Sequence, residues 1–420
     1  MRHALAVNGA FLLAAWVAQS SLWGPMRMLA AAGLVLGLPG IAWLPAFRVL
    51  MTPARAALVG VGISCASALA GGLACAAFGG SSSAWPFLIW TAIAINAGVV
   101  LSRRAVDFEL GARWGVLAGV FVLGFLATST VALRVVPPFA RAGLNLSVFV
   151  TQSSLVTGEL DPLHVREIAL IGTRAPSAFL AGLVLALLVD LVRRASGSLV
   201  AGLAAAAIYA TVPETIVRHT FAYTFIETVF VMLVAVMLFA EADLPRAPAW
   251  LAGAGVLMAV LDRRTVVLLV GVAVWYGGLA LLRRTRPDAR AVGLVVGFAA
   301  GALLSWAYGA WTGAPVGPWL GFEAPSLSLW RRFLAGTGYV IPVIGLLAAV
   351  AALVWRRDER DLLLALWALS AAEAGTLMTG LLPLVALAVV VAARPGRFRW
   401  VAAVALAGGT ALNLAADLRL

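Results

Sequence analysis

The sequence has no lysine and is poor in cysteine, histidine and charge, with two cysteines, three histidines and 11% charged residues among 420. Soluble domains carry about 25% charged residues, so this composition excludes an ordinary soluble protein. Cys65 and Cys75 stand in one apolar segment without CxxC spacing, which indicates packing residues. His3, His164 and His219 lie far apart along the chain, and we predict no bound metal.

The sequence is instead rich in apolar residues, which make up 63% of the chain and give a mean hydropathy of +1.02. A helix needs roughly 20 apolar residues to cross a hydrocarbon core of about 30 Å. We therefore predict an all-α, polytopic helical membrane protein with about 13–15 transmembrane helices in a lipid bilayer. The apolar segments are 4–22, 28–47, 56–78, 84–101, 114–136, 176–192, 198–213, 223–240, 248–261, 265–282, 291–311, 333–354, 362–378, 381–393 and 400–416.

The 30 basic residues are all arginine, and 19 of them lie at the N-terminus or in alternate loops between these segments. The positive-inside rule assigns the arginine-rich loops to the cytoplasm, together with the N-terminus. This topology explains the net charge of +12 without a nucleic-acid partner, and the Ala-, Gly-, Leu- and Arg-rich composition indicates a bacterial cytoplasmic (inner) membrane. The arginines of this side are Arg2, Arg48, Arg55, Arg103, Arg104, Arg113, Arg193, Arg194, Arg246, Arg283, Arg284, Arg286, Arg290, Arg356, Arg357, Arg360, Arg394, Arg397 and Arg399.

We divide the chain into an N-terminal region of four to five helices (1–130), a membrane core (131–400) and a last transmembrane helix with the C-terminus (400–420). The core begins with an outer loop, 137–175, which is the one sizeable segment outside the membrane. Apolar residues at helical spacing over 143–158 predict an amphipathic surface helix, with a loop that does not touch lipid as the alternative.

A second short helix is predicted over 161–172, because Asp161 and Pro162 are a favourable N-cap and first-turn pair. Two glycine ladders with a spacing of four predict close helix packing rather than ligand binding. They are Gly111, Gly115 and Gly119, and Gly293, Gly297 and Gly301.

A charged trio, Asp262, Arg263 and Arg264, interrupts the apolar stretch 248–282. Each charge at a bilayer centre costs roughly 2.5–3.5 kcal/mol on the insertion scale, so one continuous helix is disfavoured. We predict two helices with the trio at their outward-facing turn. Two adjacent arginines there can grip phosphate oxygens, or they can pair with Asp262 and lipid headgroups.

Other outer charges give weaker signals. Glu227 lies near the outer end of an apolar run, where a buried acid faces a polar cavity or pairs at the interface. Glu214, Arg218 and His219 have helical spacing and either join the same site or form an interhelical ion pair. Soluble-enzyme motifs such as GxxxxGK[ST] and HExxH are absent.

The order of these features resembles the GT-C membrane glycosyltransferases. Residues 207–239, with Thr224, Glu227 and Thr228, resemble that family's outward helix start, and residues 249–284 resemble its helical hairpin and basic loop. Pro137 and Pro138 open a segment similar to the family's first outer loop. The resemblance covers about residues 130–395 and implies a GT-C-like core.

The resemblance implies transfer of a sugar from a polyprenyl-phosphate carrier to an acceptor on the outer face, with no other cofactor. The family's base is an aspartate soon after the paired prolines, whereas this chain has Arg141, Gly143 and Asn145 there. By default, Glu159 or Asp161 would be the base, and Arg263 and Arg264 would hold the carrier phosphate.

Three functions remain open at this point. The chain is a glycosyltransferase, a non-catalytic scaffold that keeps a GT-C-like fold, or a transporter or flippase of a lipid-linked solute. The missing early aspartate favours the scaffold, whereas the absence of a recognisable inverted repeat disfavours the transporter. The sugar and the acceptor are not specified by any motif.

Overall fold

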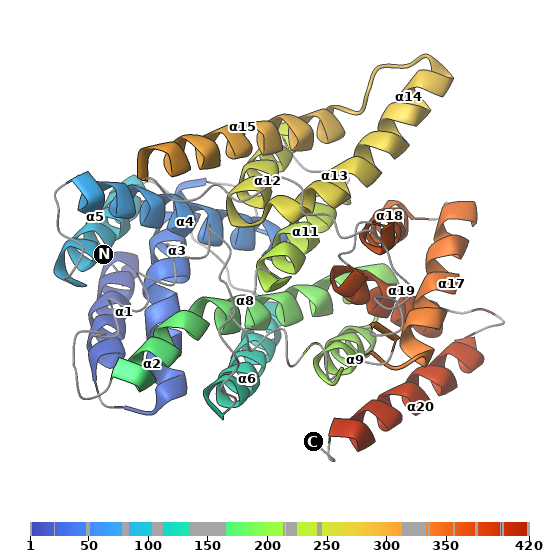
Figure 1. Cartoon of the computed structure of the whole chain (residues 1–420), viewed down its shortest axis with the longest axis horizontal. Coiled ribbons are helices and arrows are strands. Elements are labelled where there is room, and N and C mark those ends of the chain that lie inside the picture. The colour runs from blue at the N-terminus through green and yellow to red at the C-terminus, as the bar shows by residue number, and fades with distance from the viewer. Residues whose placement is uncertain are drawn as a thin grey trace. The chain divides into compact units, whose positions relative to one another are not determined.

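In the computed structural model, the described residues are 2–20, 22–47, 51–77, 84–102, 112–134, 165–212, 215, 225–241, 246–312, 333–334, 337–355, 358–373, 377–394, 396 and 399–417. All regular elements in these ranges are helical (Figure 1). The chain divides into two compact units. Unit 1 comprises 1–183, 219–226 and 305–317, and unit 2 comprises 184–218, 227–304 and 318–420.

Unit 1 is built on a broken helix that packs against its successor. Pro39 lacks a backbone N–H and follows a π-helical turn at Gly33–Gly37, which is the kind of sequence that interrupts a regular helix. The backbone N–H of Gly40 donates to the Ser64 hydroxyl at 3.0 Å. The helices are α1 (Arg2–Gln19), α2 (Gly24–Ala32), α3 (Leu38–Trp43), α4 (Pro53–Ala77), α5 (Ala84–Ser102), α6 (Ala112–Arg134) and the first part of α8 (Val165–Ser196).

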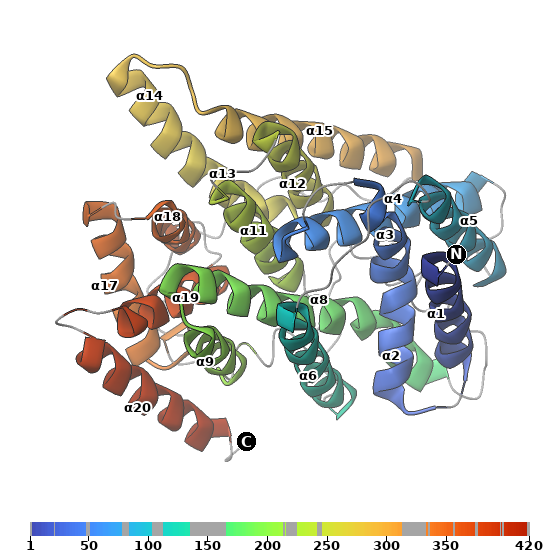
Figure 2. The same ribbon diagram turned by 180° about the vertical axis from the view of Figure 1, so that it is seen from behind.

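Unit 2 surrounds a helix of very apolar sequence, α11 (Phe225–Phe239), whose residues from Glu227 onward are buried. At the other end of this unit, α17, α18, α19 and α20 pack on one another (Figure 2). The remaining helices are α9 (Leu199–Ala210), α12 (Ala247–Leu261), α13 (Val266–Val272), α14 (Gly278–Arg283), α15 (Ala289–Thr312), α17 (Val340–Trp355), α18 (Glu359–Glu373), α19 (Leu381–Ala393) and α20 (Arg399–Asp417).

One glycine ladder brings α12 and α15 into backbone contact. A Cβ on Gly297 would lie 2.0 Å from the Ala252 carbonyl oxygen, and one on Gly293 would lie 2.4 Å from the Pro248 carbonyl oxygen. The predicted packing role of this ladder is therefore confirmed. The other ladder differs, because Cβ atoms on Gly115 and Gly119 would meet nothing within 4 Å. Its third member, Gly111, lies outside the described residues.

Among the described residues, six helices are long and apolar enough to cross a membrane, and seven apolar helices are shorter. The polytopic membrane character is thus supported, although the count of full-length spans is below the predicted 13–15. Each predicted apolar segment contains helix in its described part, but several of these helices are short. For example, the 15 residues of α11 extend only about 22 Å. The six long helices are Gly24–Phe47, Pro53–Gly71, Trp114–Leu133, Arg174–Ser196, Val266–Arg283 and Ala289–Ala310.

The predicted outer loop 137–175 falls mostly outside the described residues, which resume at Val165. The helix predicted over 161–172 is not separate in its described part. It runs into the following apolar segment as the single helix α8, with Pro176 inside it. Proline in a helix removes one backbone hydrogen bond, and here the helix continues past that loss. The predicted surface helix 143–158 is also outside the described residues.

Candidate functional site at the turn between α12 and α13

The charged trio lies at a tight turn between two helices, as predicted. The helix α12 ends at Leu261, Asp262 takes an extended backbone conformation, and a 3-10 turn over Arg263–Thr265 leads into α13. The break is local, because the Asp262 N–H still donates to the Met258 carbonyl at 3.0 Å. The turn therefore places three charges at a helix end rather than inside a helix.

Asp262 organises this turn although it is only 6% exposed. Its carboxylate accepts hydrogen bonds from the Arg264 backbone N–H at 3.0 Å and from the Thr228 hydroxyl of α11. Its backbone carbonyl accepts a hydrogen bond from the Thr265 hydroxyl at 2.6 Å. A short polar side chain that bonds to the backbone two residues ahead stabilises a turn.

Arg264 provides the accessible positive charge of the turn. Its Nε lies 3.5 Å from the Asp262 carboxylate, and 54% of its side chain is exposed. A guanidinium has five N–H donors, and the exposed part of this one can face a ligand. The pairing of Asp262 with an arginine, one of the two alternatives for this turn, is thus present for Arg264. The backbone of Arg263 lies in the 3-10 turn, but its side chain is outside the described residues.

Glu227 lies next to this turn on α11, and its hydrogen bonding differs from that of Asp262. It is 0% exposed, and neither carboxylate oxygen has a hydrogen-bond partner among the described residues. Asp262 and Arg264 are close enough to act on it electrostatically. Buried carboxylates are normally paired, so one without partners is unusual and points to a function.

The structure therefore brings together Glu227, Asp262 and Arg264 from the predicted site and adds Thr228 as a direct partner. Four other predicted site residues, Glu159, Asp161, Arg218 and His219, lie outside the described residues. Their roles stay predictions. The sequence feature that could have indicated Thr228 is its position one residue after Glu227 on an apolar helix, where a buried hydroxyl requires an acceptor.

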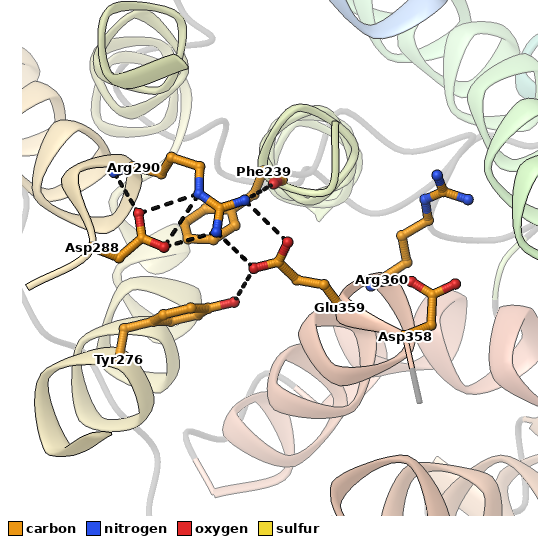
Figure 3. A network of polar contacts seen from close by, with 7 residues as sticks. All are labelled: Phe239, Tyr276, Asp288, Arg290, Asp358, Glu359 and Arg360. Atoms are coloured by element: carbon orange, nitrogen blue, oxygen red, sulfur yellow. Dashed lines mark hydrogen bonds and ion pairs between the residues drawn. The ribbon is translucent and has the colours of Figure 1, made fainter. Parts of the chain in front are cut away.

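A second polar centre in unit 2 joins four helices through Arg290 (Figure 3). The Arg290 guanidinium donates to both Glu359 oxygens at 2.9 and 3.0 Å and to Asp288 at 2.7 Å. It also donates to the Phe239 carbonyl at 3.0 Å and lies 4.7 Å from the centroid of the Phe239 ring. The Tyr276 hydroxyl donates to Glu359 at 2.8 Å.

This network around Arg290 is structural, because the N–H donors of the guanidinium are already engaged in the hydrogen bonds described above. A bidentate arginine–carboxylate pair with a stacked aromatic ring fixes geometry strongly. Burial acts to raise the pKa of Asp288, but hydrogen bonds from Arg290 outweigh it, so that the pKa lies below its ordinary value. Sequence reasoning counted Arg290 only as a loop charge. Asp288, two residues before Arg290, could have indicated an ion pair from the sequence alone, whereas Glu359 and Tyr276 are distant in sequence.

Further ion pairs join other helix ends of unit 2. At the end of α8, Asp190 accepts hydrogen bonds from Arg193 at 2.6 Å and from Arg194 at 2.7 Å. Arg394 donates to Asp361 and, at 2.9 Å, to the Ala195 carbonyl. Three of the helix ends that the arginine pattern predicts on one side of the membrane, those of α8, α18 and α19, are therefore in contact.

Comparison with protein-family models, with curated proteins and with solved structures found no match. Among the described residues, no three metal-ligating side chains of the His, Cys, Asp or Glu type come together. The groups that can carry chemistry at the turn are its two carboxylates, its hydroxyl and its guanidinium.

Proposed function

We propose that this chain is a membrane glycosyltransferase that uses a polyprenyl-phosphate-linked sugar at the outer face of a bacterial cytoplasmic membrane. The observation that carries the proposal is the grouping of an accessible arginine with two buried carboxylates at the end of a membrane hairpin. The positive-inside pattern of the arginines supports the orientation, with the N-terminus in the cytoplasm. The resemblance to the GT-C family supports the reaction class.

The proposed chemistry is an inverting displacement. The acceptor oxygen attacks the sugar carbon, the bond from that carbon to the carrier phosphate breaks, and the acceptor proton passes to a carboxylate. The leaving phosphate gains negative charge, which Arg264 is placed to neutralise. Asp262 holds Arg264 through its backbone N–H and its guanidinium, so it acts as a positioning residue. Glu159 and Asp161 stay the proposed bases by position in the sequence.

A non-catalytic scaffold is the second candidate. It is favoured by the lack of an acid close after Pro137 and Pro138. A scaffold of this kind would keep the hairpin turn and its affinity for a lipid phosphate without breaking a bond. The transporter or flippase alternative has no specific observation in its favour.

The test is binding of farnesyl phosphate, a short polyprenyl phosphate, to the purified full-length protein. Losing one hydrogen-bonded contact to a charged group costs about 1.5–3 kcal/mol, so Arg264→Ala should weaken binding about ten- to a hundredfold. Arg263→Ala and the double variant extend the test to both arginines. Arg284→Ala is the matched control, since Arg284 is an exposed arginine at the end of α14.

The same preparations are then given a panel of hexose and pentose polyprenyl-phosphate donors, with release of free polyprenyl phosphate as the readout. Turnover that Arg264→Ala reduces supports the enzyme. Binding without turnover of any donor supports the scaffold. Equal binding by wild type, both single variants and the double variant would show that the turn does not hold a phosphate.

A further inference from the structure

Two neighbouring carboxylates in unit 2 stand in opposite environments. Asp262 accepts hydrogen bonds from Thr228 and from the Arg264 backbone, and its carboxylate is 3.5 Å from the Arg264 guanidinium. Glu227 is fully buried, and within the described ranges neither of its carboxylate oxygens has a hydrogen-bond partner. Asp262 and Arg264 are the charged groups of the described chain that act on Glu227.

The two environments assign different protonation states. A buried ion without partners costs several kcal/mol even after the surroundings relax, whereas a neutral acid avoids this cost. Asp262 has the donors and the cation that an ionised carboxylate requires. Among the described residues Glu227 has no side-chain donor, the attraction of Arg264 is smaller than the cost of burial, and a second negative charge beside Asp262 would add repulsion. A pair whose environments differ in this way divides into one ionised and one protonated member.

We propose that Glu227 carries a proton that is required for anion binding at the α12–α13 turn, so that a lipid phosphate and a proton bind together. This inference rests on the proposed function, because it uses the same phosphate site. It goes further by making the site proton-coupled. Nothing in the sequence motifs assigned a proton to this residue.

The coupling follows from simple chemistry. A protonated carboxyl group is a hydrogen-bond donor, and a phosphate oxygen is an acceptor. Glu227 then offers an unused O–H beside the guanidinium of Arg264, which is half exposed. When Glu227 is ionised, it offers no donor and repels the phosphate. Since Asp262 already offsets part of the Arg264 charge, an ionised Glu227 would further weaken the attraction that a phosphate meets.

The main experiment measures farnesyl phosphate binding to the full-length protein from pH 6 to pH 10, in wild type and in Glu227→Gln. Above the pH at which Glu227 loses its proton in the free protein, wild-type affinity should fall by up to tenfold per pH unit. Glutamine is similar in size, keeps an N–H donor and cannot ionise, so its affinity should vary much less with pH. The ligand's own phosphate titration is common to both proteins and cancels in the comparison. An identical pH dependence in the two proteins would overturn the proposal.

A second arm identifies the anion. Inorganic phosphate is tested in place of farnesyl phosphate under the same conditions. Binding of farnesyl phosphate that far exceeds that of inorganic phosphate assigns the site to a lipid phosphate. Equal, pH-dependent binding of both assigns it to free phosphate and overturns the lipid part of the proposal.

Infrared difference spectroscopy gives a readout that does not depend on binding. The wild-type spectrum at neutral pH should contain the carbonyl stretch of a protonated carboxylic acid, and Glu227→Gln should remove it. Absence of that band overturns the proposal even if phosphate binds. If the band and the proton-coupled binding are present but no sugar donor is turned over, the proposed enzyme fails and the proton site stands.

Discussion

At the scale of single residues, Thr228 shows how a buried hydroxyl connects two helices. It is 2% exposed, lies on α11 and donates to Asp262 at the end of α12. Without the hydroxyl, the buried Asp262 carboxylate loses one of its donors. Hydrogen bonds to charged groups contribute about 1.5–3 kcal/mol, so the partnership matters for both the fold and the site.

We expect Thr228→Val to lower the free energy of unfolding by about 1.5–3 kcal/mol, because valine keeps the shape and removes the donor. The measurement is unfolding of the purified protein in detergent. Thr130→Val is the control, since the Thr130 hydroxyl donates only within its own helix, to the Leu126 carbonyl at 2.7 Å. An equal effect of the two substitutions would contradict the cross-helix role of Thr228.

A second residue-scale prediction concerns pH. Because the pKa of Asp288 is lowered in the folded protein, its ionised form favours folding. That stabilisation is fully present above the ordinary aspartate pKa of about 3.9, and it is lost as the pH falls through the lower folded value. We expect Asp288→Asn to reduce thermal stability at pH 7 and to narrow its difference from wild type in acid. If the difference in thermal stability between wild type and Asp288→Asn stayed constant from pH 7 down to pH 3, it would contradict the pairing of Asp288 with Arg290.

At the scale of elements, the glycine ladder of α15 sets how closely two membrane helices approach. Small residues at this spacing allow backbone contact and van der Waals packing, which drive helix association in membranes. A Cβ on Gly301 would lie 2.5 Å from the Val256 carbonyl oxygen, and one on Gly255 would lie 2.2 Å from the Leu294 carbonyl oxygen. The contact therefore uses glycines from both α12 and α15.

We expect Gly297→Ala to destabilise the protein by about 1–3 kcal/mol, because the added methyl group forces α12 and α15 apart. Gly115→Ala is the matched substitution, since its methyl group meets nothing within 4 Å. Alanine there should be neutral or stabilise by up to about 1 kcal/mol through helix propensity. The free energy of unfolding is measured for both variants. A similar decrease in the two would contradict the explanation that the Gly297 methyl group forces α12 and α15 apart.

At the scale of the whole molecule, the grouping of charged helix ends and the arginine pattern both bear on topology. Arg394, the residue after α19, forms an ion pair with Asp361 of α18 and a hydrogen bond to the Ala195 carbonyl of α8, and a separate network joins the ends of α11, α15 and α18. A membrane barrier cannot lie between residues in direct contact. We therefore expect these ends to share one side of the membrane, and the positive-inside rule predicts that it is the cytoplasmic side.

We expect single cysteines at positions 145 and 325 to react with a membrane-impermeant reagent added outside intact cells, and a cysteine at 287 to be protected. Cys65 and Cys75 are first replaced by serine so that only the new thiol reports. Permeabilised cells provide the control, in which position 287 should also react. Labelling of position 287 in intact cells would reverse or refute the topology.

The sequence by itself determined the class of protein and the position of most helices. Apolar runs predict membrane helices because, in lipid, each segment must satisfy its own backbone hydrogen bonds. The charges at 262–264 predict a turn because burying three charges in lipid is costly. The packing role of Gly293, Gly297 and Gly301 was also predictable, since their spacing places them on one helix face.

Only the tertiary structure decided which charges meet. Glu227 and Thr228 stand next to each other in sequence, yet in the part of the chain that the structure describes the Glu227 carboxylate accepts no hydrogen bond, whereas Thr228 donates one to Asp262. Arg290 and Glu359 are 69 residues apart and form a bidentate pair. Such partners depend on how helices pack, and helical periodicity carries no information about which faces touch. The same packing leaves Gly115 and Gly119 without a neighbour, although their spacing equals that of the ladder on α15.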